Sequence, residues 1–383
     1  MKKYLAIIMA AVLAVTCFVG CGKTETADNE IVIGGIGPIT GPAAAYGNAV
    51  MNGAQLAVDE INAAGGIGFE GIKIKFDFQD DEHDAEKAVN AYNTLLDNNM
   101  KILMGTVTST PCVAVAAKAA EDNMFLLTPS GSAVECVAAP NAFRICFSDP
   151  DQGIASAQYI AQHNVAKKVA VIYNSSDVYS DGIYQKFAAE AKVQGLEIVT
   201  AQAFTKDSAT DFTVQIQKVK ESGAELMFLP IYYQEAALIL TQANKAGLDI
   251  KVFGCDGLDG VIDQLGDNAA IAEGVMLLTP FAADAEDELT KSFTAAYQKK
   301  YNEIPTQFAA DGYDAIYTIK MAMERVGIED ASISASDLCE ALKSAMVEIE
   351  VEGVTGTMSW AASGEPVKEP KAMVIKDGSY KAM

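Results

Sequence analysis

Short apolar runs alternate with longer amphipathic segments along the first part of the chain. Residues 72–78 alternate strictly between apolar and polar side chains, which predicts a strand with one exposed face. Residues 31–34, 102–105 and 125–127 are apolar throughout, which is typical of buried parallel strands. The segments between them carry apolar residues at helical spacing. Residues 31–132 therefore predict the order βαβαβαβ of a doubly wound α/β domain.

The same alternation returns in the middle of the chain. Apolar runs that begin near 168, 196, 226, 252 and 275 predict strands, and three intervening helices end at glycines. Three helical stretches follow, near 286–301, 311–326 and 335–346, and the last residues are strand-like. A chain of 383 residues is too long for one core. We therefore predict an α/β protein with two doubly wound parallel-sheet lobes.

The two predicted lobes have no long linker between them. Short crossings are expected near 147–151, 279–282 and 357–360, so the lobes should be joined by a multi-strand hinge. The predicted N-terminal lobe is 31–147 plus 282–356, and the C-terminal lobe is 148–281 plus 357–383.

Two hydroxyl-rich turns follow neighbouring predicted strands. Residues 106–111 follow the strand at 102–105, and residues 128–132 follow the strand at 125–127. Ligands of open parallel sheets bind at the carboxyl ends of strands, and hydroxyls with a helix start suit a carboxylate. Pro111 suits the first position of the following helix, so Ser109 or Thr110 is the expected N-cap. The alternative is two ordinary strand-to-helix loops with capping hydroxyls.

The first 21 residues are typical of an export signal. Two lysines precede an apolar run that is short for a membrane span. The run ends at Cys21, in a context that resembles the lipobox of bacterial lipoproteins; Cys17 is a weaker candidate. We expect cleavage before Cys21, lipidation of that residue, and a polar tether over 22–30. The predicted location is extracytoplasmic, with a lipid anchor as the only membrane contact.

Charge and cysteine content narrow the possible partners. The formal net charge is −23 and no basic patch occurs, which argues against nucleic-acid binding. Five cysteines follow the leader without CxxC spacing, so no zinc site is predicted. Cys136 and Cys146 are either a disulfide or two buried thiols. His83 lies in an acidic loop that we interpret as exposed, with Asp84 as a helix cap, rather than as a metal site.

No enzyme motif is present in the sequence. The glycine-rich segment 35–41 is one residue too long for GxGxxG, and its proline removes an N–H that a pyrophosphate needs. There is no P-loop and no GxSxG elbow. We therefore predict a protein that is not an enzyme and has no cofactor. A hydrolase remains a rival that an activity screen would exclude.

An ordered set of short motifs resembles the branched-chain amino acid-binding members of the type I periplasmic binding proteins, which serve ABC importers. The motifs are Gly41-Pro42, Tyr46-Gly47, Asn52-Gly53-Ala54, VDEINAAGG at 58–66, Asp80-Asp81, Gly105 with Ser109, Thr128-Pro129, VYSDG at 178–182, Ala246-Gly247 and GCDG at 254–257. The resemblance covers nearly all of residues 31–383. It implies two lobes that close on a zwitterionic amino acid.

The resemblance also implies a role for individual residues. Ser109 and Ser132 would hold the α-carboxylate, the Ser130 carbonyl would accept from the α-ammonium, and Asp256 would be its counter-charge. The apolar wall would consist of Tyr46, Tyr179, Tyr232 and Phe308. These roles agree with the general requirement that a buried zwitterion has both charges paired.

The expected function is therefore binding of a branched-chain or related apolar amino acid for an ABC importer, by a monomer that docks on permease subunits. Asp256 stands where leucine-type relatives carry Glu, and Ser132 where they carry Thr, so the side chain that is bound stays open. The same fold binding urea, short amides or aromatic acids is one alternative. A ligand sensor without transport is another.

Overall fold

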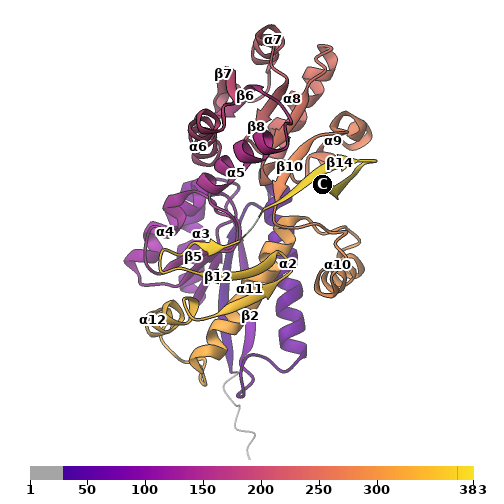
Figure 1. The fold of residues 1–383 in the computed structure, drawn as a ribbon. Helices are drawn as coiled ribbons and strands as arrows, with labels where there is room; N and C mark the ends of the chain where they lie inside the picture. Colours follow the sequence, from indigo (N-terminus) through magenta and orange to yellow (C-terminus); the bar gives the residue numbers. More distant parts are fainter. Residues whose placement is uncertain (1–28, 369) are drawn as a thin grey trace, which may run out of the picture.

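The computed structural model describes residues 29–368 and 370–383 of the chain. The predicted signal segment, Cys21 and most of the predicted tether lie outside the described residues. Two α/β lobes are stacked end to end, one built around α2 and α11 and the other around α6 to α9 (Figure 1). This confirms the predicted fold class.

The first lobe is built on a parallel five-stranded sheet with the order β2-β1-β3-β4-β5. Its strands are β1 (Glu30–Gly37), β2 (Lys73–Asp80), β3 (Ile102–Gly105), β4 (Leu126–Thr128) and β5 (Ala142–Arg144). Its helices are α2 (Ala44–Ala63), α3 (Ala85–Asp97), α4 (Ser109–Glu121) and the short η1 (Val134–Val137). The apolar runs of β3 and β4 are buried on both faces, as their composition predicts.

The second lobe repeats this plan. Strands β7-β6-β8-β9-β10 form its parallel part in the same order, and β14 and β15 extend it antiparallel beside β10. The strands are β6 (Lys168–Asn174), β7 (Glu197–Phe204), β8 (Leu226–Leu229), β9 (Lys251–Gly254), β10 (Met276–Thr279), β14 (Lys371–Lys376) and β15 (Ser379–Ala382). The helices are α5 (Asp149–Gln162), α6 (Val178–Gln194), α7 (Thr213–Ser222), α8 (Tyr233–Lys245) and α9 (Val261–Leu265), with short turns of helix at η2 (Lys206–Ser208), η3 (Asp256–Leu258) and η4 (Gly266–Ala272).

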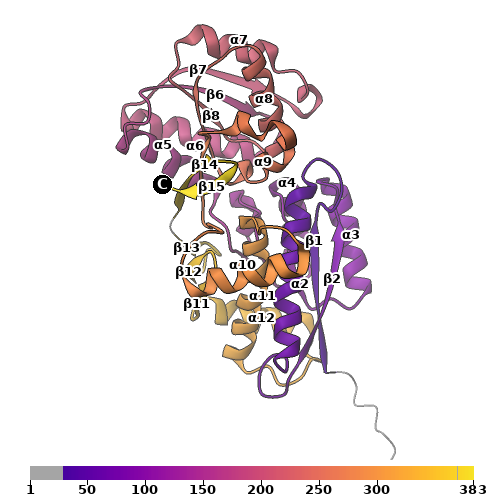
Figure 2. The same ribbon diagram turned by 90° about the vertical axis from the view of Figure 1, so that its right-hand side faces the viewer.

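After β10 the chain returns to the first lobe. It forms α10 (Glu288–Tyr301), α11 (Gln307–Val326) and α12 (Ala335–Met346), and α11 packs along α2 (Figure 2). Gly53 and Gly312 permit this close crossing, because a Cβ at either would collide with backbone of the other helix. Helix α2 is therefore covered by a segment about 250 residues later in the chain.

A small antiparallel sheet follows α12. It consists of β11 (Glu350–Gly353), β12 (Gly356–Trp360) and β13 (Pro366–Val367). The Trp360 indole N–H donates to the Arg144 carbonyl, 2.7 Å away, which ties β12 to the end of β5. Strands β12 and β13 thus lie against the first lobe, whereas the predicted boundary placed 357–383 with the second. Only β14 and β15 from that range join the second sheet.

The loop at 79–84 differs from its predicted form. Asp84 caps α3 as predicted, since its carboxylate accepts from the Glu86 and Lys87 N–H groups. The expectation of a wholly exposed loop is wrong, because Asp81 is fully buried and His83 is partly buried against Thr108. Burial raises the pKa of the Asp81 carboxyl to about 7. The loop faces the interior because β2 delivers it next to the start of α4.

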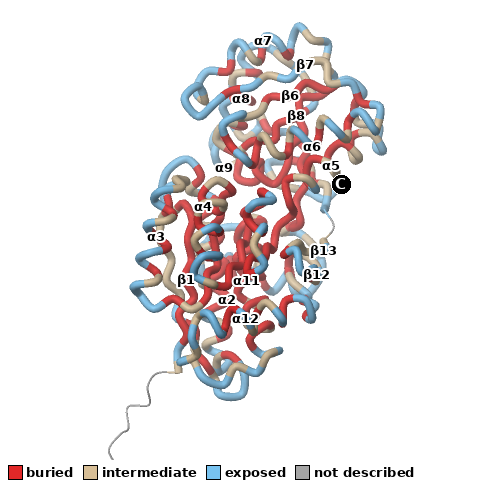
Figure 3. The backbone as a smooth tube through the Cα atoms, turned by 90° about the vertical axis from the view of Figure 1, so that its left-hand side faces the viewer, coloured by how far each residue is buried: buried red, intermediate tan, exposed pale blue. Residues whose placement is uncertain are grey.

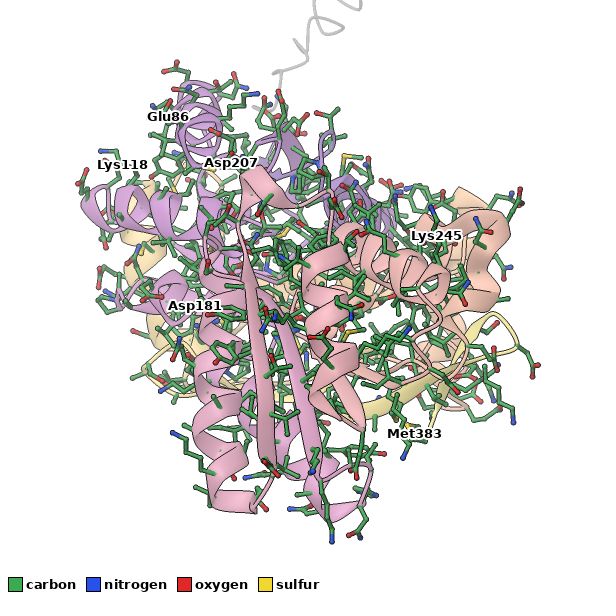
Figure 4. All side chains as sticks on the ribbon, turned by 90° about the horizontal axis from the view of Figure 1, so that it is seen from above. Glu86, Lys118, Asp181, Asp207, Lys245 and Met383 are labelled. Atoms are coloured by element: carbon green, nitrogen blue, oxygen red, sulfur yellow. The ribbon has the colours of Figure 1, made fainter. Side chains whose placement is uncertain are left out.

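Burial is concentrated in the two sheets and in the segments where the lobes meet (Figure 3). Charged side chains lie mainly on the outside: Glu86, Asp207 and Lys245 are exposed and are labelled in the view from above (Figure 4). Within the described residues, no helix combines the length and the apolar character needed to cross a membrane.

Candidate functional site

The carboxyl ends of β3 and β4 bring the two predicted hydroxyl-rich turns together. The Ser109 hydroxyl accepts from the backbone N–H groups of Ser132 and Ala133, each at 3.2 Å, and lies 3.3 Å from the Ser132 hydroxyl. Ser109 is the first residue of α4, and Thr108 is the N-cap without a side-chain bond. The prediction that Ser109 or Thr110 caps α4 is therefore wrong. The Ser109 hydroxyl turns to the neighbouring loop instead.

This pair of turns is tightly held. Thr128 donates to the Thr106 carbonyl (2.6 Å) and accepts from the Gly131 N–H (2.8 Å), and the Ser130 hydroxyl donates to the Val107 carbonyl (2.7 Å). Behind the loop, the fully buried Arg144 guanidinium donates to the carbonyls of Gly131 and Ala133 and pairs with Glu365. The loop conformation around Ser132 is thus determined by buried hydrogen bonds and by one buried cation.

The second lobe places Asp256 opposite these turns. Asp256 begins η3 directly after β9 and is 4% exposed. Its Oδ1 accepts from the Tyr179 hydroxyl (2.7 Å) and its Oδ2 from the Gln152 amide (3.0 Å). Burial raises the pKa of the Asp256 carboxyl to about 6, against the opposing effect of the Tyr179 hydrogen bond.

The four predicted aromatic residues form one cluster that spans both lobes. Tyr46 stacks on Phe308 with ring centroids 4.1 Å apart, and Tyr179 stacks on Tyr232 at 4.7 Å. Tyr46 also meets Tyr232 edge to face at 5.5 Å. The Tyr46 hydroxyl donates to the Gly257 carbonyl (2.5 Å) and accepts from the Tyr233 N–H (3.0 Å). The structure therefore shows the lobes in contact through these side chains.

A cavity of about 290 Å³ lies where the lobes meet beside this cluster. Its lining includes Tyr232 and several polar side chains from both lobes: His83, Thr110, Asp177, Lys206 and Glu235. Thr110 donates to Asp177 across the interface at 3.1 Å. Burial raises the pKa of Asp177 to about 6 and that of Glu235 to about 7, and lowers the pKa of His83 to about 4. This side of the interface thus holds several titratable side chains among apolar ones.

Helix α5 connects the two halves of the site. The Asp149 N–H donates to the Ser132 carbonyl at 2.9 Å, and Gln152, one turn later, binds Asp256. Sequence reasoning missed both residues and treated 143–151 only as a crossing segment. An acid and an amide three residues apart, at the predicted crossing near 147–151, were the available signal.

All eight predicted ligand-binding residues lie at or near the junction of the lobes, and all except the partly buried Tyr232 are buried. Their roles toward a ligand stay predictions. Among the described residues, the five cysteines are free and buried, so Cys136 and Cys146 are not joined. This agrees with the interpretation of buried thiols.

The model of a family described as periplasmic binding protein matches residues 30–378. The chain belongs to this family. Its members are substrate-binding proteins, which are not enzymes. Membership implies an extracytoplasmic location.

Two proteins with similar sequences have names that state which amino acids they bind. The chain is 30% identical over 348 residues to the Leu/Ile/Val-binding protein homolog 3 of Brucella melitensis, covering 90% of each chain. It is 26% identical to a leucine-, isoleucine-, valine-, threonine- and alanine-binding protein of Pseudomonas aeruginosa, covering 84% of this chain and 85% of that one.

Solved structures show the same two-lobed fold. The branched-chain amino acid transporter substrate binding protein LivJ of Streptococcus pneumoniae, in complex with isoleucine, superposes with a TM-score of 0.83 at 30% identity, covering 92% of this chain and 98% of that one. A benzoate-bound solute binding protein from R. palustris superposes with a TM-score of 0.82 at 21% identity, covering 92% and 95%, and this likeness shows the fold alone.

Proposed function

We propose that this protein binds a branched-chain or related apolar amino acid between its two lobes and delivers it to an ABC importer. The observation that carries the proposal is the pairing of opposite chemistries across one junction. Ser109 and Ser132 present hydroxyls and a helix start on the first lobe, whereas Asp256 presents a carboxylate on the second. A zwitterion needs both, because each of its charges must be paired when it leaves water.

The aromatic cluster supports an apolar ligand side chain. Tyr46 and Phe308 come from the first lobe, and Tyr179 and Tyr232 from the second, so closure surrounds a ligand with rings. The proposed motion is a hinge movement between two lobes, for which the predicted bounds are 31–147 plus 282–356 and 148–281 plus 357–383. Strands β12 and β13 from the last range would move with the first lobe, because β12 is bound to β5 and only β14 and β15 join the second sheet. The names of the two relatives and the isoleucine in the S. pneumoniae structure support the ligand class.

Calorimetric titration of the chain from residue 22 onward with the twenty amino acids tests this proposal. We expect binding of one or more of leucine, isoleucine and valine, and no binding of urea or benzoate. Asp256→Asn should weaken amino-acid binding by about 2–5 kcal/mol, because the ammonium loses its charged partner. The exposed Asp263→Asn on α9 is the matched control and should bind as the unaltered protein does. Absence of binding to every amino acid would refute the proposal.

We further propose that Cys21 is lipidated, that the mature protein is a monomer, and that it docks on permease subunits. Metabolic labelling with radioactive palmitate should mark the full chain and should not mark Cys21→Ser. Light scattering of the chain from residue 22 should give the mass of one chain. Co-purification with a permease encoded beside it would separate transport from the alternative of a ligand sensor.

A further inference from the structure

Asp149 is a buried acid at the point where the chain passes from the first sheet to the second. It is the first residue of α5 and is 2% exposed. Its side chain does not cap the helix, because the Ser148 hydroxyl accepts from the Asp151 N–H and fills that role. Its backbone N–H is bound to the Ser132 carbonyl, which places it next to the serine turns.

One carboxylate oxygen of Asp149 lies against the first turn of α6. A Cβ at Gly182 would come within 3.1 Å of Asp149 Oδ2, so the glycine leaves room for the acid. Within the described part of the chain, the buried Oδ1 has no hydrogen-bond partner. An anionic oxygen buried in this way is unfavourable unless a cation or a donor meets it.

The nearby cation, the Arg144 guanidinium, already has other hydrogen-bond and ion-pair partners. Arg144 lowers the pKa of Asp149 through its charge, but its Nη1 donates to Gly131, its Nη2 donates to Ala133, and its remaining charge pairs with Glu365. Burial is the largest influence on Asp149 and raises the pKa of its carboxyl well above the usual range, against the opposing effect of a hydrogen bond with the Ser132 side chain. The charges of Asp256 and Asp177 add to the increase.

Asp149 and Asp256 are connected through one helix turn. Gln152, three residues after Asp149 on α5, donates to Asp256 Oδ2 and accepts from the Asp256 N–H at 3.3 Å. Both oxygens of Asp256 therefore already have a protein donor, Tyr179 or Gln152. Among the described residues, several buried carboxylate oxygens near the junction have no hydrogen-bond partner, namely Asp149 Oδ1, Asp259 Oδ1 and both oxygens of Asp311. Of these acids, Asp149 is the one whose backbone N–H is bound to the Ser132 carbonyl.

We propose that Asp149 binds the α-ammonium of the ligand directly, together with Asp256, and so makes the site selective for amines over carboxylic acids of the same shape. This inference rests on the proposed function. An α-amino acid carries its two charged groups on one carbon atom. When the ligand carboxylate binds Ser109 and Ser132, the ligand ammonium therefore lies beside Asp149. The backbone N–H of Asp149 donates to the Ser132 carbonyl.

Titration with leucine and with its deaminated counterpart, 4-methylpentanoate, tests the inference. The unaltered protein should prefer leucine, and Asp149→Asn should weaken leucine binding by about 30-fold or more, as expected for a buried charged partner. The same variant should bind 4-methylpentanoate no more weakly than before. Asp151→Asn, an exposed acid in the same helix turn, is the matched control and should change neither affinity by more than about threefold.

The outcomes separate the two proposals. If the unaltered protein binds no amino acid, the proposed function fails. If it binds leucine and Asp149→Asn binds it equally well, only this inference fails. Should Asp149→Asn not fold, a crystal structure of the unaltered protein with its amino acid decides. A ligand nitrogen within hydrogen-bond distance of Asp149 Oδ1 supports the assignment, and one more than about 4 Å away overturns it.

Discussion

Replacing Tyr46 with Phe removes a single hydroxyl group that joins the two lobes. This hydroxyl lies on α2 of the first lobe, and its two hydrogen-bond partners, the Gly257 carbonyl and the Tyr233 N–H, belong to the second. The ring itself can stay in place, since its stacking on Phe308 and its edge-to-face contact with Tyr232 need no oxygen. The substitution therefore tests the contact between lobes and leaves the packing intact.

The expected magnitude follows from the two lost hydrogen bonds. A buried hydrogen bond contributes about 0.5–1.5 kcal/mol net, so the closed arrangement should lose about 1–3 kcal/mol. When the lobes separate, water can satisfy the Gly257 carbonyl and the Tyr233 N–H, so the loss applies to the closed form alone. Because ligand binding is coupled to closure in our proposal, the dissociation constant should rise by about 5- to 150-fold.

Isothermal calorimetry with the bound amino acid measures this change, with Tyr92→Phe as the matched control. The Tyr92 hydroxyl donates to Asp122 (3.0 Å) within the first lobe, so its loss should lower the free energy of unfolding without altering affinity. A dissociation constant of Tyr46→Phe within twofold of the unaltered protein would refute the reasoning. An equal loss of affinity in Tyr92→Phe would also refute it, because the effect would then not come from the contact between lobes.

Three further predictions concern the interior. Arg144→Met should lower the free energy of unfolding by about 3–5 kcal/mol, because it leaves two carbonyls and Glu365 without their buried partner; chemical denaturation measures this, and a loss below about 1 kcal/mol would contradict it. Burial raises the pKa of Asp259 to about 6, so this carboxyl binds a proton more tightly in the folded chain than in the unfolded one. The free energy of unfolding should therefore fall by up to about 3 kcal/mol as the pH rises from about 4 to about 6, and Asp259→Asn should lose this part of the dependence; an unchanged pH profile in the variant would be the contrary result. Thiol titration of the chain from residue 22, denatured without reductant, should count the five free cysteines, whereas three would show that a pair had oxidised.

Much of the fold is predictable from local pattern. The apolar runs of β3, β4 and β8 and the glycine-ended helices α6 and α7 occur where periodicity places them, within a few residues. The serine turns were also predictable as neighbours, because the carboxyl ends of adjacent parallel strands share one edge. Local sequence suffices here because each element buries side chains at a spacing that is set by its own geometry.

Other features depend on contacts between distant parts of the chain. The sequence around Ser109 favours an N-cap, but the N–H groups of the 132–133 loop engage its hydroxyl instead. The acidic loop at 79–84 looks exposed in sequence, yet β2 carries Asp81 into the interior. For Ser109, a tertiary partner competes successfully with solvent for a polar group. For Asp81, tertiary packing buries the carboxylate although its Oδ1 accepts from the nearby His83 N–H. No local pattern encodes either outcome.

By itself, the sequence determined two lobes of alternating strands and helices and the chemistry available at their strand ends. Only the tertiary structure decided how the lobes meet: Tyr46 reaches Gly257, α11 returns to cover α2, and α5 binds Ser132 through Asp149 and Asp256 through Gln152. The physical reason is the separation along the chain between the groups that interact. Periodicity records which side chains must leave water, whereas the identity of the group that receives each of them depends on chain segments up to about 250 residues away.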